Sequence, residues 1–128
     1  MNSKLRTPLA RVRGLGSSRS GTEHFWRQRL TAVANIPLTI AFVLIVVSLL
    51  GRNHAAAQQI LGSPLVAIVI LLFIGSVTYH MRIGMQVIIE DYVHSDVPKL
   101  FLLMLNTFFT IVVGLAAAYA IFKLSFGV

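Results

Sequence analysis

Hydrophobic residues are concentrated in three blocks, and short segments between the blocks hold most of the polar residues. The first block covers 30–51 and the last covers 100–122, and neither contains a formal charge. The middle block, 64–89, is interrupted only by His80 and Arg82. A helix needs about 20 apolar residues to span a bilayer, and each block is long enough. Because open sheet edges are not satisfied in lipid, the pattern predicts an all-α integral membrane protein with three transmembrane helices.

We expect these helices at about 29–50, 64–92 and 98–123. Pro37 lies inside the first helix, where it frees a backbone carbonyl and favours a kink. The other two helices begin at a proline, which suits the first turn of a helix. The segment 51–63 between the first two helices is expected to be a polar loop. Every loop is short, so none of them is expected to form an enzyme pocket by itself.

Basic residues are concentrated before the first span. The formal net charge is +7, from 11 basic and 4 acidic residues. The basic residues before the first span are Lys4, Arg6, Arg11, Arg13, Arg19, Arg27 and Arg29. This distribution follows the positive-inside rule and predicts a cytoplasmic N-terminus and a C-terminus on the opposite side. Basic flanks of membrane spans account for the charge, so no nucleic-acid partner is expected.

The first 22 residues differ in composition from the rest of the chain. Residues 1–22 are basic, rich in Ser and Gly and free of acids, a composition that overlaps with mitochondrial transit peptides. We favour a flexible cytoplasmic tail held near anionic lipid, followed by a three-helix membrane anchor domain at 23–128. The chain has no cysteine, which excludes disulfides and iron–sulfur ligation by its own side chains.

His80 is an ionisable residue within the second predicted span, and such residues are functional candidates because their burial in lipid is costly. It lies about 24 Å along this helix at roughly 1.5 Å per residue. Ser76 and Gly84 sit one turn to either side, and Asp91 lies nearly in line with it. A neutral imidazole beside small residues can ligate haem iron, with a second ligand from another subunit. The alternative is a hydrogen bond from His80 to a neighbouring helix.

Tyr92 and Asp91 of the second helix have two interpretations each. The Tyr92 phenol can donate a hydrogen bond to a carbonyl oxygen, and Asp91 can orient it or relay protons. Alternatively, Tyr92 is an interface anchor and the acid ends the helix. Arg82 is about 200° around the helix from His80, so it does not share the His80 face. We expect Arg82 to extend its side chain to the cytoplasmic interface.

Two stretches of the sequence resemble a known family. The run HMRIGMQVIIEDYVHSD, residues 80–96, resembles the second helix of the small hydrophobic membrane-anchor subunit of succinate dehydrogenase, respiratory complex II. That family has a histidine, a glycine four residues later, and an Asp-Tyr pair eleven and twelve residues later. The stretch FWRQRLTAVANIPLT, residues 25–39, resembles the start of the family's first helix. The resemblance covers about 22–123, and Arg82 has no counterpart in the family pattern.

The resemblance implies a role in electron transfer to a quinone. His80 would be one axial ligand of haem b, and the larger cytochrome b subunit would supply the other. Tyr92 would hydrogen-bond ubiquinone with the support of Asp91, and Arg29 would be a candidate partner of a haem propionate. The implied partners are a flavoprotein subunit that oxidises succinate, an iron–sulfur subunit, the cytochrome subunit and lipid. The implied location is the bacterial plasma membrane, or the mitochondrial inner membrane of a eukaryote.

Two other functions are consistent with the residues. The chain would also suit an anchor of fumarate reductase, in which electrons run from quinol outward, because the direction depends on partner potentials that this chain does not encode. It would also suit a structural or assembly membrane protein without redox function. In that case His80 would be an interhelical hydrogen-bonding residue and Tyr92 an anchor. An optical spectrum distinguishes the redox anchors from the structural protein.

Overall fold

The computed structural model describes residues 7–14 and 20–127, and all its regular elements are helices. In chain order they are α1 (Pro8–Val12), α2 (Ser20–Ser48), α3 (His54–Leu61), α4 (Pro64–Tyr92) and α5 (Asp96–Phe126). Three of them, over Gly21–Ser48, Pro64–Tyr92 and Asp96–Phe126, are long and apolar enough to cross a membrane. The predicted all-α protein with three transmembrane helices is confirmed.

The middle helix has the predicted bounds, whereas the other two long helices extend beyond them. α2 begins at Ser20 instead of near 29, because the polar residues before the span are themselves helical. Glu23 stands in the first turn of α2 and forms an ion pair with Arg27 one turn later, and both features stabilise a helix start. α5 exceeds the predicted 98–123 at both ends. The tail predicted over 1–22 lies partly outside the described residues.

The predicted polar loop between the first two spans contains a helix, so that part of the prediction was wrong. Asn53 caps α3 through a hydrogen bond that its side chain accepts from the Ala56 backbone N–H at 2.9 Å. The alanines that follow are strong helix formers. α3 packs close to the end of α5: a Cβ added at Gly62 would lie 3.2 Å from the Leu124 carbonyl oxygen. Only glycine permits this close approach without displacing a neighbour.

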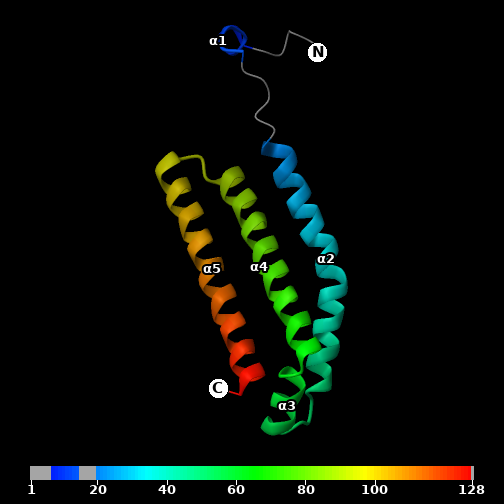
Figure 1. Ribbon diagram of the computed structural model, residues 1–128. Helices are drawn as coiled ribbons and strands as arrows, with labels where there is room; N and C mark the ends of the chain where they lie inside the picture. The colour runs from blue at the N-terminus through cyan, green and yellow to red at the C-terminus, as the bar shows by residue number, and fades with distance from the viewer. Residues whose placement is uncertain (1–6, 15–19, 128) are drawn as a thin grey trace.

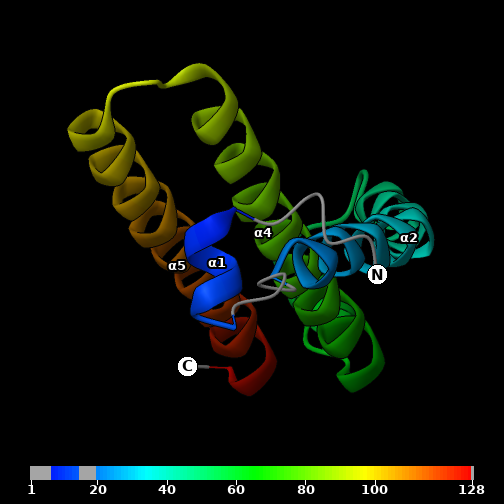
Figure 2. The same ribbon diagram turned by 90° about the horizontal axis from the view of Figure 1, so that it is seen from above.

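α4 lies between the other two long helices (Figures 1 and 2). It runs antiparallel to α2 and α5 and contacts both, whereas α2 and α5 do not contact each other within the described residues. The Phe42 and Phe73 rings stack at a centroid distance of 4.5 Å between α2 and α4. The Asn106 side-chain amide of α5 donates a hydrogen bond to the Arg82 carbonyl of α4 at 3.0 Å. α2 bends near its middle, the region of Pro37, as the sequence predicted (Figure 1).

Very little of the chain is buried within its own fold. The buried residues of the described part are Ala67, Ile70, Ile83, Ile89 and Thr110. Large apolar side chains cover the outside of all three long helices; Leu65, for example, is 74% exposed. Exposed apolar surface on this scale marks contact with membrane or with another protein. The three helices form a thin layer with two broad faces, both of which are available to lipid or to other chains.

Candidate functional site

His80 of α4 contacts Thr31 of α2 across the interface between the two helices. The His80 Nδ1 and Thr31 Oγ1 atoms are 2.9 Å apart, and both residues are half-buried. Because the helices are antiparallel, Asn35 and Ser76 lie one turn deeper at a common level. The Asn35 Oδ1 and Ser76 Oγ atoms are buried without a hydrogen-bond partner among the described residues. His80 therefore belongs to a small polar layer between two apolar helices.

The hydrogen bonds of Thr31 indicate which His80 nitrogen carries the proton. The Thr31 hydroxyl lies 2.9 Å from the Arg27 carbonyl and 3.0 Å from the Gln28 carbonyl, so it donates its hydrogen to the helix backbone. With that hydrogen directed to the backbone, the Thr31 oxygen can accept a hydrogen bond from His80 in the tautomer that carries the proton on Nδ1. This tautomer leaves a lone pair on Nε2, the arrangement in which histidine binds a metal ion.

The Nε2 atom of His80 makes no hydrogen bond among the described residues and is not fully buried, and the residue as a whole is half-buried. Gly84 lies one turn away, and a Cβ added there would meet no heavy atom within 4 Å. The surface around His80 and Gly84 therefore has room for a flat group beside the imidazole.

Arg27 lies next to the Thr31–His80 contact, on the side of α2 that faces α4. Its guanidinium donates a hydrogen bond to the Tyr79 hydroxyl at 3.3 Å and is paired with Glu23. Arg29 is two residues further along, about 200° around the helix. The Arg29 guanidinium carbon lies 5.0 Å from the centroid of the Phe25 ring, and the side chain is exposed. Arg29 is therefore free to meet a group outside this chain, whereas Arg27 is engaged within it.

Asp91 and Tyr92 are at the C-terminal end of α4, near the level where α2 begins (Figure 1). Both are exposed, and Tyr92 has 79% of its surface accessible. They belong to the same turn as Glu90, which accepts a hydrogen bond from Gln86 at 2.8 Å. Consecutive residues of a helix point about 100° apart, so the carboxylate and the phenol lie side by side without facing each other. Any pocket around them needs walls from other molecules.

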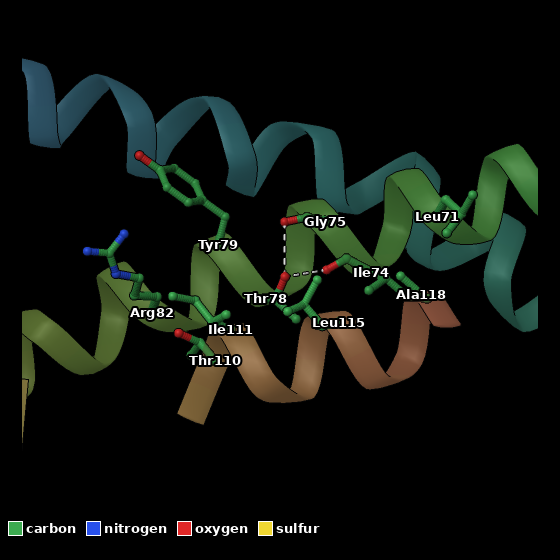
Figure 3. Close-up of a pocket in the computed structure, with 11 residues that line it drawn as sticks. Leu71, Ile74, Gly75, Thr78, Tyr79, Arg82, Thr110, Ile111, Leu115 and Ala118 are labelled. Atoms are coloured by element: carbon green, nitrogen blue, oxygen red, sulfur yellow. Dashed lines mark hydrogen bonds between the residues drawn. The ribbon is translucent and has the colours of Figure 1, made fainter. Parts of the chain in front are cut away.

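Arg82 lies in a groove on another side of α4. A polar pocket of about 190 Å³ between α2 and α4 is lined by Glu23, His24, Arg27, Tyr79, Arg82, Ile83 and Gln86. It adjoins an apolar groove of about 380 Å³ along α4 and α5, to which Tyr79 and Arg82 also contribute (Figure 3). No hydrogen bond or ion pair of the Arg82 guanidinium is found among the described residues. Of the two arginines that line the polar pocket, Arg27 is bonded to Glu23 and Tyr79, and Arg82 has no partner among the described residues.

The structure thus separates the predicted residues into three locations. His80 lies in the polar layer with Thr31, the Asp91–Tyr92 pair is at the helix end, and Arg29 is on the outer face of α2. Within the described residues, no group of three or more His, Cys, Asp or Glu side chains gathers to hold a metal ion, so a metal bound at His80 needs a ligand from elsewhere. Thr31 was missed by sequence reasoning. A threonine near the start of a helix gives only a weak signal in the sequence, because its contact with His80 depends on how α2 and α4 are aligned.

Comparison with protein families gives an independent result. Residues 3–119 match the family model described as the succinate dehydrogenase/fumarate reductase transmembrane subunit. The match covers α4 completely and most of α5, so it includes both His80 and the Asp91–Tyr92 pair. No solved structure matches the chain.

Individual relatives agree with the family match. A succinate dehydrogenase hydrophobic membrane anchor subunit of Paracoccus denitrificans is 30% identical over 121 residues, which cover 94% of this chain and 93% of the relative. A protein of the same description from Rickettsia bellii is 29% identical over 124 residues, 95% of this chain and 98% of the relative. A succinate dehydrogenase membrane anchor subunit of Reclinomonas americana is 33% identical over 86 residues, 65% of this chain and 72% of the relative.

Proposed function

The chain belongs to the succinate dehydrogenase/fumarate reductase transmembrane subunit family, and we propose that it helps to bind haem b and forms part of a ubiquinone-reduction site. As a multi-pass membrane anchor of succinate dehydrogenase, it works with the other subunits of that complex. We assign these as a flavoprotein, an iron–sulfur subunit and a larger cytochrome b subunit. The cluster of basic residues before α2 supports an orientation with this end of the bundle toward the cytoplasm.

The observation that carries the haem assignment is the contact between Thr31 and His80. With the Nδ1 proton donated to Thr31 over 2.9 Å, the Nε2 lone pair would remain for the iron, and Nε2 makes no hydrogen bond among the described residues. Gly84 leaves open space beside the ring, so the residues fit a planar porphyrin. His80 would supply one ligand to the haem iron through Nε2, and the cytochrome subunit would supply another. When bound, haem b supplies a one-electron carrier inside the membrane.

Thr31 would orient the imidazole by accepting the Nδ1–H hydrogen bond. Arg29 would face a haem propionate, because the residue is exposed and forms no ion pair with an acid of the described residues. Arg27 is less suited to that role because Glu23 and Tyr79 already engage it.

The quinone site would lie at the Asp91–Tyr92 end of α4. Ubiquinone enters from the bilayer, whereas its electrons come from a soluble subunit and its two protons come from water. The C-terminal end of α4 lies near the level where α2 begins (Figure 1). At that level the bilayer, the soluble subunit and water would all be within reach of the site. There the Tyr92 hydroxyl would donate a hydrogen bond to a quinone carbonyl oxygen, and Asp91 would deliver protons toward it. The exposure of both side chains supports a site completed by partner subunits.

The fumarate reductase alternative uses the same residues in the reverse direction. The family description includes both enzymes, whereas the relatives above are all described as succinate dehydrogenase subunits. Those descriptions favour succinate oxidation. A purely structural anchor differs from both, because it needs neither an accessible Nε2 at His80 nor open space at Gly84.

An optical spectrum of the purified complex tests the proposal. We expect flavin and iron–sulfur subunits to co-purify with this chain, and dithionite to give the reduced band of haem b. His80→Ala should abolish or loosen haem binding, whereas His54→Ala, at the exposed start of α3, should leave the spectrum unchanged. An unaltered haem content in the His80 variant would refute the assignment. A wild-type complex without a haem band would favour the structural anchor.

A further inference from the structure

We propose that the groove containing Arg82 binds an anionic phospholipid, with the phosphate in the polar pocket and an acyl chain in the apolar groove. Neither the haem site nor the quinone site uses this groove. The polar pocket has a volume of about 190 Å³, the apolar groove about 380 Å³, and both are lined by Tyr79 and Arg82. One end of a continuous surface is therefore charged and the other is apolar, which is the pattern of a phospholipid.

The charged end lies at the level expected for lipid headgroups. α2 has 29 residues, about 43 Å at 1.5 Å per residue, which exceeds the roughly 30 Å of hydrocarbon in a bilayer. Its first two turns, which supply Glu23, His24 and Arg27, therefore reach the headgroup region. The exposed Trp26 in the same turns is typical of a membrane interface. Arg82 extends from α4 toward this region, on the same side as the Tyr79 phenol (Figure 3).

The charges of the pocket favour an anion. Arg27 is already paired with Glu23 and donates to Tyr79, so these charges nearly compensate each other. The Arg82 guanidinium remains without a partner among the described residues, and an unpaired arginine within a membrane span is costly. The Nε2 atom of His24 is also buried there without a hydrogen-bond partner. A phosphate with two free oxygens matches the planar fork of the arginine.

The remainder of the groove suits an acyl chain. Beyond Arg82 the lining is mainly apolar, and the hydroxyls of Thr78 and Thr110 are bonded to carbonyls of their own helices. Small residues on both helices keep the groove open: Gly75, Gly114 and Ala118. A Cβ added at Gly75 would meet no heavy atom within 4 Å, so the groove is open beside this residue. From Arg82 to Leu71, at the other end of the groove in Figure 3, the distance along α4 is about 16 Å.

The groove is separate from the proposed haem site. Arg82 and Gln86 lie about 200° and 240° around α4 from His80, so they point to the opposite side of the helix. A lipid in this groove would occupy a face that the imidazole does not use. It would thereby satisfy Arg82 without any contribution from the redox centres.

Lipid binding can be measured by native mass spectrometry of the whole purified complex titrated with phosphatidylglycerol or with phosphatidylcholine of the same chains. One arginine near an anionic group favours the anionic lipid by about fivefold. We expect this preference in the wild type and its loss in Arg82→Gln, whereas Arg52→Gln removes an equal charge from the α2–α3 turn and should preserve it. Gly75→Leu fills the groove and should weaken both lipids equally. Ala116→Leu, at an exposed α5 position outside the groove, should weaken neither.

Other results would overturn the proposal. They are an unchanged preference in Arg82→Gln, an equal loss in Arg52→Gln, or undiminished lipid binding in Gly75→Leu. Displacement of phosphatidylglycerol by millimolar inorganic phosphate would indicate that the site binds an anion and that the acyl chain of the lipid contributes nothing. Displacement by ubiquinone would make the groove a quinone site. Succinate oxidation with an artificial acceptor verifies that each variant complex is assembled.

Discussion

Replacing Thr31 with Val removes one hydroxyl and nearly preserves the shape of the side chain, so it tests the proposed orientation of His80 without removing the ligand. In the proposed tautomer, the Thr31 oxygen accepts the hydrogen bond from Nδ1 over 2.9 Å. In the Val variant that N–H loses this acceptor. The imidazole is then free to rotate or to move its proton to Nε2, and both changes compete with binding to iron. We expect the variant to hold haem more weakly.

The size of the effect follows from the lost hydrogen bond. Leaving a buried N–H unpaired costs about 1–3 kcal/mol, and loss of an outer hydrogen-bond partner typically lowers metal affinity about 10–100-fold. His80 and Thr31 are only half-buried, so solvent replaces part of the lost interaction. We therefore expect the lower end of the range, a haem affinity reduced by about tenfold. This loss is smaller than that of His80→Ala, which removes the ligand itself.

The rate of haem transfer from the complex to excess apomyoglobin measures this effect. Thr31→Val should release haem about tenfold faster than the wild type. Thr31→Ser, which retains the hydroxyl, should release it at nearly the wild-type rate. Thr39→Val, at an exposed position of the same helix, controls for the loss of a hydroxyl elsewhere. A wild-type rate in Thr31→Val, together with haem loss in His80→Ala, would show that Thr31 does not orient the ligand.

Four further substitutions test the quinone site and the fold. Tyr92→Phe should slow quinone reduction by about twofold to tenfold, the worth of one hydrogen bond between neutral groups, whereas succinate oxidation with an artificial acceptor persists. Equal loss of both activities would indicate misassembly. Asp91→Asn should lower quinone-linked turnover by about tenfold, less than the 10²–10⁴ of a direct proton donor, and unchanged rates across pH would exclude Asp91 from the proton path. Gly62→Ala should destabilise the chain by about 1–3 kcal/mol through overpacking against the Gln58 and Leu124 backbone carbonyls. Gly75→Ala should instead be neutral or stabilising in thermal denaturation, and the reverse order would contradict the packing argument.

The membrane fold was predictable because it depends on block length, a property of the sequence alone. Uncharged blocks of about 20 residues leave no alternative to helices in lipid. The start of α2 and the helix α3 were not predicted because they lie outside the apolar blocks. Their stability comes from local interactions, the Glu23–Arg27 pair and the Asn53 cap. In the sequence alone, an acid four residues before an arginine, or a single asparagine, occurs in loops as well as in helices.

The candidate site was predictable only where a single residue carried the signal. His80 was identified because an ionisable group interrupts an apolar block, and this argument needs no knowledge of its neighbours. Thr31 is far away in the sequence, and its contact depends on how α2 and α4 are aligned against each other. The same alignment brings Arg27 to Tyr79 and turns Arg29 outward. When two helices are apolar on nearly all sides, the sequence of one helix does not specify which of its faces packs against the other.

The position of α4 explains why its polar residues can serve separate purposes. It is the only long helix of the described structure with neighbours on both sides, so two of its faces pack against α2 and α5 and two remain uncovered. One uncovered face adjoins His80 and Gly84, and the other presents Arg82 and Gln86. A partner subunit with haem and a lipid would then cover different faces of the same helix. Variants can separate these roles: Gly84→Leu should impair haem binding and preserve the lipid preference, and Arg82→Gln should do the opposite. If either substitution affected both properties equally, the two faces would not act independently.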